Sequence, residues 1–346
     1  MRALCLTATG GPEKLALLEL PSPPLRHPGE VRIGIRAVAL NRLDLLVAQG
    51  LPAVPLAALP HIVGCDGAGV VLEVGAAVTH LAVGDRVLLN PGWGCGECEA
   101  CVTGDDVFCR DFGVQGEHRS GTAAEEVVLP GRNAIRIRGT WSWAEAAAFP
   151  LATLTAWRML ATRARLRSGE AVLIWGIGGG VALAALQIAR HLGARVAVTS
   201  ATPEKLARAG ALGAELLLDH GGQSDIAAAV KGHFGHGADV IVDSVGSATW
   251  ARSLKALRPG GRLVTCGATA GHDVALDLRR LFWFQWSLLG STMGTPREFA
   301  EVVVLGEAGL LRPPIAAVLP LADGKEAYRR LAATERFGKL VLEVSP

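Results

Sequence analysis

The sequence contains little tyrosine, little net charge and no long apolar run. Its 346 residues include one tyrosine and carry a formal net charge of only +2, so neither a nucleic acid nor an anionic membrane is an expected partner. The longest late apolar run, Leu281–Gly290, is too short to cross a bilayer. The N-terminal residues lack the apolar core of a secretory signal peptide. We therefore expect a cytoplasmic protein that acts on a small molecule.

Apolar residues are, by contrast, abundant. They make up 50% of the chain, against 19% charged residues, a balance that is typical of folded globular proteins. A chain of 346 residues is long enough for two domains that each have a core.

Four of the seven cysteines lie in one short stretch, with the spacing Cys95-x2-Cys98-x2-Cys101-x7-Cys109. Four thiolates on such a loop can enclose a tetrahedral zinc ion with no open position, so the ion would stabilise the fold without taking part in chemistry. Gly94 and Gly96 allow the loop to fold tightly around an ion. An iron–sulfur cluster would suit the same ligands, and without a metal the cysteines would be free or paired in disulfides. The expected cytoplasmic location favours zinc.

Three segments of the chain differ in their pattern. Residues 1–151 indicate short strands, such as Val31–Ala37, and few helices, among them Leu43–Gln49. Residues 152–292 alternate strands with helices, which is typical of a parallel sheet covered on both faces. Residues 293–346 return to the first pattern and end in a predicted strand, Lys339–Val344. We predict an α/β protein in which a doubly wound parallel-sheet domain is inserted into a β-rich domain.

A glycine-rich turn lies near the start of the second segment. The apolar strand Ala171–Trp175 leads into this turn, and a helix begins at Val181. The turn contains Gly176, Gly178, Gly179 and Gly180. Glycines at a strand-to-helix turn let the backbone approach a pyrophosphate, and the helix N-terminus offers unpaired N–H groups and a positive dipole. The context predicts a dinucleotide site, although a tight turn that binds nothing has the same pattern.

Taken together, these features resemble the medium-chain dehydrogenase/reductase superfamily, which contains the zinc alcohol dehydrogenases and the quinone oxidoreductases. The resemblance covers essentially the whole chain. Its motifs are Asn41-Arg-Leu-Asp44, Gly64-Cys-Asp66-Gly-Ala-Gly69, Val83-Gly-Asp-Arg-Val87, the cysteine loop, Gly176–Val181, Asp243-Ser-Val-Gly246 and Gly338-Lys-Leu. It implies a GroES-like catalytic domain of residues 1–151 and 293–346, a Rossmann domain of residues 152–292, and hydride transfer with a nicotinamide cofactor.

By this resemblance, Asn41, Cys65 and Leu151 stand where alcohol dehydrogenases hold a catalytic zinc. Leucine cannot bind a metal and a neutral amide binds zinc poorly, so no catalytic zinc is expected. Asn41 with Asp44 is instead similar to the zinc-free quinone oxidoreductases. Asn41 could stabilise charge on the substrate oxygen, or could hold the cofactor ribose or a turn, and Asp44 could orient either the ribose or Asn41. A degenerate zinc site with Cys65 and Asp66 is the alternative.

The expected cofactor is NADP(H), with NAD(H) possible. In relatives that bind NAD, a carboxylate ends the second strand of the nucleotide domain. Here that strand ends at Ser200 without an acid, and Lys205 follows, although Lys205 could equally be a solvated helix residue. By resemblance, further cofactor contacts come from Thr155, Val181, Asp243, Gly246, Gly267 and Met293.

The function expected from these observations is an NADPH-dependent reductase of quinones, enones or related carbonyl compounds, with a structural zinc. A reversible alcohol dehydrogenase that uses the degenerate zinc site is one alternative. A non-catalytic NADPH-binding sensor or structural protein is another. In relatives the strand near Leu288–Thr292 pairs across a dimer, so the resemblance implies a homodimer or a homotetramer.

Overall fold

The computed structural model describes residues 1–51, 59–222, 225–333 and 335–345, and the chain divides into two units. Unit 1 comprises Met1–Ala152 and Gly294–Pro346, and unit 2 comprises Thr153–Met293. The domain boundaries expected from the sequence lie one residue before these. No helix in the described part of the chain is long and apolar enough to cross a membrane.

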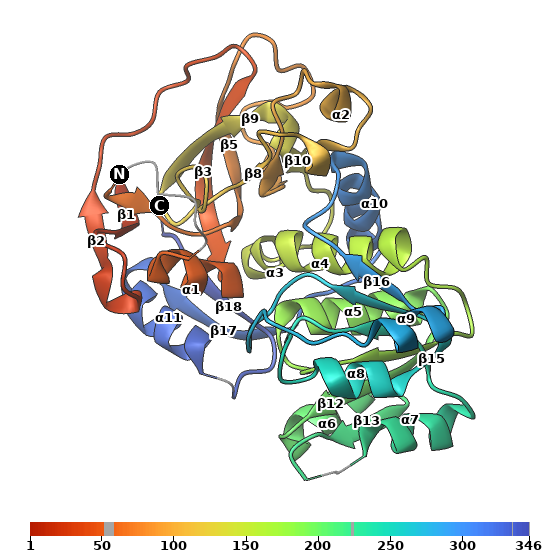
Figure 1. The fold of residues 1–346 in the computed structure, drawn as a ribbon. Coiled ribbons are helices and arrows are strands. Elements are labelled where there is room, and N and C mark those ends of the chain that lie inside the picture. Colours follow the sequence, from red (N-terminus) through yellow and green to blue (C-terminus); the bar gives the residue numbers. More distant parts are fainter. Residues whose placement is uncertain (52–58, 223–224, 334, 346) are drawn as a thin grey trace. The chain divides into compact units, whose positions relative to one another are not determined.

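Unit 2 is built on a six-stranded parallel sheet with the order β13-β12-β11-β14-β15-β16 (Figure 1). Its strands are β11 (Ala171–Ile174), β12 (Arg195–Ser200), β13 (Leu216–Asp219), β14 (Ala238–Val242), β15 (Leu257–Thr265) and β16 (Ser287–Gly290). Every residue of the central strands β11 and β14 is buried, as expected for a sheet covered on both faces. The order reverses between β11 and β14, and open sheets bind ligands at such a reversal. The predicted doubly wound domain is confirmed.

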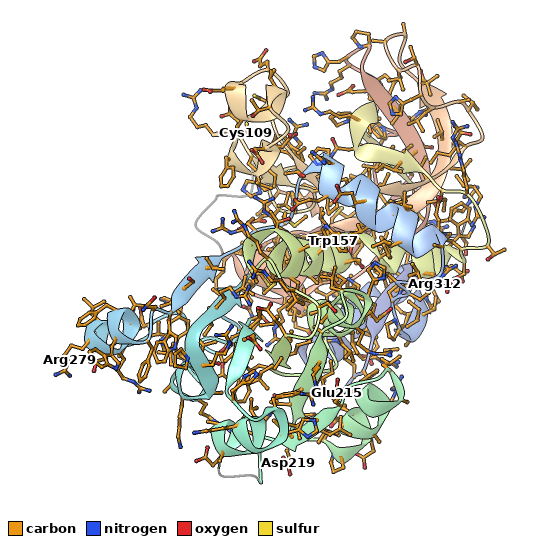
Figure 2. The ribbon with its side chains drawn as sticks, turned by 90° about the vertical axis from the view of Figure 1, so that its right-hand side faces the viewer. Cys109, Trp157, Glu215, Asp219, Arg279 and Arg312 are labelled. Carbon is orange, nitrogen blue, oxygen red and sulfur yellow. The ribbon has the colours of Figure 1, made fainter. Side chains whose placement is uncertain are left out.

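Helices connect the strands of unit 2. They are α5 (Gly180–His191), α6 (Pro203–Ala211), α7 (Ile226–Phe234), α8 (Trp250–Ala256) and α9 (Leu278–Trp283), with a π-helical segment over Arg158–Arg163. In α5, Leu183 and Leu186 are buried with their alanine neighbours, because they repeat at the helical period. In Figure 2, α9, which carries the labelled Arg279, projects from the rest of unit 2. The aromatic stretch that contains α9 is therefore largely surface, with Phe282 and Trp283 both exposed.

Unit 1 is organised around β3 (Glu30–Ala39), which lies in a seven-stranded sheet with the order β10-β6-β5-β3-β18-β17, with β9 also paired to β3. The other strands of that sheet are β5 (Asp66–Val74), β6 (Arg86–Leu89), β9 (Glu126–Pro130), β10 (Ala134–Arg136), β17 (Ile315–Pro320) and β18 (Lys339–Glu343). Smaller sheets contain β1 (Arg2–Leu6), β2 (Leu15–Glu19) and β4 (His61–Ile62), and β7 (Gly92–Trp93) with β8 (Gly113–Val114). Since β18 lies between β3 and β17, the C-terminal segment completes the sheet that the N-terminal segment begins.

Unit 1 contains more helix than the sequence pattern predicts. The predicted helix is α1 (Arg42–Gln49), which ends at the left-handed Gly50. The others are α2 (Glu99–Val102), α3 (Trp143–Ala148), α4 (Pro150–Trp157), which runs into unit 2, α10 (Pro296–Glu307) and α11 (Gly324–Ala332), with short 3-10 turns between. Capping boxes at Ser142 and Thr295 begin α3 and α10. The expectation that the C-terminal segment is mainly strand is therefore wrong, because α10 and α11 occupy much of it.

Candidate functional site

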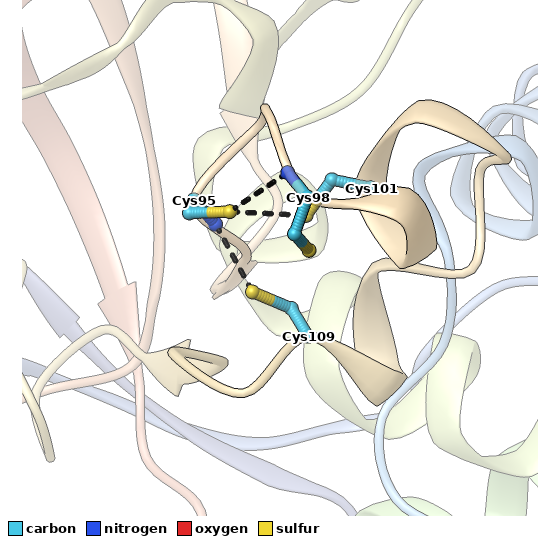
Figure 3. Close-up of side chains that lie close together, drawn as sticks. All are labelled: Cys95, Cys98, Cys101 and Cys109. Atoms are coloured by element: carbon cyan, nitrogen blue, oxygen red, sulfur yellow. Dashed lines mark hydrogen bonds between the residues drawn. The ribbon is translucent and has the colours of Figure 1, made fainter.

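The four cysteines of the loop after β7 converge, as the spacing predicts. Their sulfur atoms all lie within 4.8 Å of one another, and Cys95 Sγ is 3.9 Å from Cys101 Sγ (Figure 3). Gly94 and Gly96 are needed for this fold, because a Cβ at Gly94 would lie 2.5 Å from Cys101 Sγ and one at Gly96 would lie 2.1 Å from the Arg132 guanidinium.

Backbone amides point at the sulfur atoms of this cysteine cluster. Cys98 N–H donates to Cys95 Sγ at 3.3 Å, and Cys95 N–H donates to Cys109 Sγ at 3.3 Å. The backbone N–H groups of Glu97 and Cys98 lower the pKa of the Cys95 thiol to about 6. Four converging sulfur ligands with amide donors fit a zinc ion in a closed tetrahedral site.

A second polar group lies inside unit 1 and contains all four residues predicted to be catalytic. We call it the polar centre: Asn41, Asp44, Cys65, Asp66 and Lys339. Asn41, before α1, donates from its backbone N–H to Asp44 Oδ2 at 2.6 Å. Its side-chain Nδ2 donates to Asp66 Oδ2 at 2.8 Å and to the Ala39 carbonyl at 3.4 Å. The amide hydrogens are thus engaged within unit 1.

Lys339 completes the polar centre, although the sequence alone predicts no role for it. Its Nζ donates to Asn41 Oδ1 at 2.5 Å and to Asp66 Oδ2 at 3.1 Å. The only signal in the sequence was its place in the Gly338-Lys-Leu motif. Contact between residues 273 positions apart cannot be read from local patterns.

Burial raises the pKa of two members of the polar centre, Cys65 and Asp44. The Cys65 thiol donates to Asp44 Oδ1 at 3.4 Å. Burial, with the nearby Asp44 carboxyl, raises the pKa of Cys65 well above its usual value. Burial also raises the pKa of Asp44 to about 6, although the Asn41 N–H and the Lys339 ammonium act in the opposite direction. Cys65 therefore remains a neutral thiol near pH 7.

The polar centre does not fit a second zinc ion. The Cys65 thiol already has a partner within the chain, since it donates to Asp44 Oδ1 at 3.4 Å. Asp66 is already engaged, since Oδ1 accepts from Leu151 N–H at 2.8 Å and Oδ2 accepts from Asn41 and Lys339. Within residues 1–51, 59–222, 225–333 and 335–345, the cysteine cluster is the one set of three or more His, Cys, Asp or Glu side chains close enough to hold an ion.

The glycine turn of unit 2 has the geometry that a pyrophosphate site needs. Gly176 and Gly178 have φ angles of 69° and 129°, which favour glycine. Thr199 fixes the turn, because its Oγ1 accepts from Gly176 N–H at 3.0 Å and its carbonyl accepts from Ile177 N–H. No side chain caps α5 at Gly179, so the amides of its first turn, Gly180 and Val181 included, remain available to an anion.

Basic side chains gather at the carboxyl ends of β12 and β13. Ser200 is buried and ends β12, and Lys205 lies in the first turns of α6. His220 Nδ1 lies 3.0 Å from Thr199 Oγ1, and the Arg252 guanidinium donates to the His220 carbonyl at 3.4 Å. Burial is the main cause that lowers the pKa of His220, followed by the charges of Arg252 and Lys205.

A carboxylate is also present near this end of the sheet, but its hydrogen bonds are to its own loop. Asp219, labelled in Figure 2, ends β13. Its Oδ1 accepts from the backbone of Gly221 and Gly222. The strand that should carry an acid in an NAD-type site, β12, carries none.

The remaining predicted cofactor residues divide into turn-forming residues and residues that pack together. Asp243 accepts from Val245 N–H, Gly246 N–H, Thr249 Oγ1 and Ser253 Oγ, so its carboxylate is engaged in shaping the turn after β14. Gly246 has a φ of 92°, and a Cβ there would lie 2.2 Å from the Gly271 carbonyl. Gly267 lies in the turn after β15. Thr155 Oγ1 lies 4.0 Å from Met293 Sδ, and Met293 has an unusual φ of 47°.

Comparison with known proteins identifies the family of both units of the chain. Residues 27–139 match the family described as alcohol dehydrogenase GroES-like domain, and residues 180–307 match the family described as zinc-binding dehydrogenase. A solved structure of an NAD-dependent alcohol dehydrogenase is 42% identical, with each chain fully covered and a TM-score of 0.96.

Two curated relatives differ greatly in length. The acryloyl-coenzyme A reductase of Metallosphaera sedula is 30% identical over 315 residues, which cover 91% of this chain and 92% of the relative. The polyketide synthase GfsB of Streptomyces halstedii is 35% identical over 323 residues, which are 92% of this chain but 5% of that protein. The chain is therefore an oxidoreductase that belongs to the medium-chain dehydrogenase/reductase superfamily.

Proposed function

We propose that this chain is an NADPH-dependent reductase of enones, quinones or related carbonyl compounds that works without a catalytic zinc. The observation that carries this proposal is the polar centre. At the positions that the family resemblance assigns to a catalytic zinc site, the Asn41 side chain is hydrogen-bonded to Lys339 and Asp66, the Cys65 thiol donates to Asp44, and Leu151 offers no side-chain ligand. Without a catalytic zinc, hydride transfer depends on the side chains of this protein and on the cofactor.

The cofactor supplies a hydride from C4 of its nicotinamide ring. The amides at the start of α5 and the glycine turn hold the pyrophosphate. At the end of β12, the absence of an acid and the presence of the cations Lys205 and Arg252 favour a 2′-phosphate over a free 2′-hydroxyl. The related structure named NAD-dependent makes NADH the competing cofactor.

Within unit 1, the hydrogen bonds of the polar centre fix the orientation of the Asn41 side chain. Both hydrogens of the Asn41 amide point to acceptors of unit 1, which favours a positioning role for Asn41 over donation to a substrate oxygen. The proton that completes carbonyl or enone reduction then comes from water or a ribose hydroxyl.

Enones head the proposed substrate list because a full-length relative is named acryloyl-coenzyme A reductase. Such a substrate has a double bond conjugated to a carbonyl, so a hydride can add to the β-carbon while charge develops on the carbonyl oxygen.

We also propose that the cysteine cluster holds one structural zinc ion. Four thiolate ligands leave no open coordination position, so the ion stabilises the loop after β7 and does not bind substrate.

The test is zinc content and activity measured on the same purified protein, before and after mild chelation. We expect one zinc per chain, and NADPH oxidation with an enone or quinone from a panel that also contains aldehydes. An activity that disappears together with a second, looser zinc would instead indicate an alcohol dehydrogenase. Tight NADPH binding without turnover of any panel member would favour a non-catalytic binding protein.

The substitution Ser200→Asp tests the proposed preference for NADPH over NADH. The new carboxylate would repel a 2′-phosphate, so we expect the ratio of kcat/KM for NADPH to that for NADH to fall at least tenfold, about 1.4 kcal/mol. Ser200→Ala is the matched control, because it removes the hydroxyl without adding charge and should leave the ratio within about twofold. An unchanged ratio in Ser200→Asp would contradict the proposed 2′-phosphate site.

A further inference from the structure

Lys339 is the member of the polar centre that has no role of its own in the proposed function. It begins β18, and its side chain is 4% exposed. An ammonium group in such a place is unfavourable unless acceptors surround it. Asn41 Oδ1 and Asp66 Oδ2 are those acceptors, at 2.5 and 3.1 Å.

The ammonium group decides which way the Asn41 amide faces. An ammonium can only donate hydrogen bonds and a carboxylate can only accept them. The amide oxygen must therefore face Lys339, and the amide nitrogen must face Asp66. A flipped amide would place its NH2 group against the ammonium and its oxygen against the carboxylate, which are both repulsive contacts.

Asp66 connects this pair to the next element of the chain. Its second oxygen, Oδ1, accepts from the backbone N–H of Leu151 in the first turn of α4. One carboxylate thus holds Asn41, Lys339 and the start of α4, and the charge of Lys339 balances it. A divalent ion beside this pair would meet an ammonium of the same sign.

We propose that Lys339 is the positioning residue of the polar centre, and that its ammonium is the cation around which Asn41 and Asp66 are arranged, in place of a second metal ion. Activity readouts for this inference rest on the proposed function. Metal content and unfolding do not, so they test the charge arrangement even if the reductase assignment fails.

The experiment compares Lys339→Met, Asp66→Asn and the double variant with wild type, using Lys325→Met as the control. Lys325 is an exposed lysine of α11, so its variant should resemble wild type. We expect each single variant to lower the urea midpoint, and the double variant to lose less than the sum, because it removes both members of the Lys339–Asp66 ion pair. All forms should hold one zinc per chain after equilibration with excess zinc.

Measurements of kcat/KM distinguish a positioning role of Lys339 from a role in stability alone. We expect kcat/KM to fall at least 30-fold in Lys339→Met and to stay low in the double variant, although the double variant loses less stability than the two single variants together. Lys339→Arg keeps the cation and should retain at least tenfold more activity than Lys339→Met. If Lys339→Met does not fold, the comparison is made between the double variant and Asp66→Asn.

Three results would overturn the inference. They are a second zinc bound by the wild-type chain, urea midpoints that add without coupling, and a double variant that regains activity together with stability. A wild-type chain that turns over no panel substrate would instead overturn the proposed function alone, since the first two results are measured without substrate.

Discussion

Asp44 is a buried carboxyl whose proton affinity differs between the folded and unfolded chain. It is 1% exposed, and burial raises its pKa from 3.8 to about 6. The charged or titratable groups around it are Lys339, Asp66, Cys65 and, from α11, Tyr328. Because the folded state holds this proton more tightly, Asp44 adds stability at low pH that is lost as the pH rises from about 4 to about 6.

Asp44→Asn removes this titration. We expect the free energy of unfolding of wild type, relative to that of Asp44→Asn, to fall by roughly 3 kcal/mol between pH 4 and pH 6, from a shift of about two units at about 1.4 kcal/mol each. Urea unfolding at several pH values measures the difference. Parallel pH curves for the two proteins would show that Asp44 does not titrate in this range.

Cys98 is one of the four cysteines that we propose as zinc ligands, and its replacement should abolish zinc binding by the cluster. Cys98→Ser leaves three thiols on a loop whose glycines fit a closed cluster. We expect less than 0.2 zinc per chain and a loss of stability on the order of 3 kcal/mol or more.

The control for this variant is Cys266→Ser, which changes a cysteine outside the cluster. It should keep one zinc. A Cys98→Ser protein without zinc but as stable as wild type would contradict a structural role for the ion.

Two glycines in helices show that the effect of a glycine-to-alanine substitution on stability depends on what surrounds the helix. Gly306 of α10 is buried, and a Cβ there would lie 2.6 Å from Trp141 and 2.9 Å from Phe149. Gly232 of α7 is exposed, and nothing lies within 4 Å of its would-be Cβ. Alanine is the better helix former by about 1 kcal/mol.

We therefore expect opposite signs for the same change. Gly232→Ala should raise the free energy of unfolding by about 0.5–1 kcal/mol, whereas Gly306→Ala should lower it by about 1–3 kcal/mol because the core is overpacked. Chemical denaturation of both variants measures this, and a stabilised Gly306→Ala would mean that α10 packs less tightly than the distances indicate.

Secondary structure was most predictable where the pattern is local. The strand–helix alternation of unit 2 follows from apolar runs and glycine turns, and the sequence predicts α1 to within one residue. α3 was missed because its alanine-rich sequence has no amphipathic period, being buried on most sides. α10 and α11 do have apolar faces, at Phe299 and Val302 and at Ala327 and Leu331, so the sequence pattern is compatible with these helices.

The candidate site was predicted in its members and not in its connections. The convergence of the four cysteines was predictable from their spacing, since they lie within 15 residues of one another. The pairing of Lys339 with Asn41 joins residues 298 positions apart, and only the order β3-β18 in the sheet brings them together.

At the scale of the whole molecule, β16 ends the sheet of unit 2 as an edge strand next to the exposed residues Phe282 and Trp283, which are 68% and 76% exposed. Exposed aromatic groups beside an unpaired strand edge are typical of an association surface. We propose that two copies of the chain associate through this edge.

Trp283→Lys should weaken that association at least tenfold, because a charge replaces the largest apolar group of the edge. Sedimentation equilibrium measures it. Leu310→Lys, at an exposed apolar residue of unit 1, is the control and should leave the dimer intact. A wild-type chain that stays monomeric at high concentration would contradict the proposed surface.

Unit 1 is formed from two segments of the chain with unit 2 between them, and this affects the order in which the units can fold during protein synthesis. Unit 2 is continuous, whereas the sheet of unit 1 lacks β18 until Lys339–Glu343 have been made. At roughly 5–20 residues per second, a ribosome needs several seconds to add the last segment after unit 2 is complete. During that interval unit 2 can fold before unit 1 is complete. The edge of β3 that pairs with β18 in the finished protein then has no partner strand.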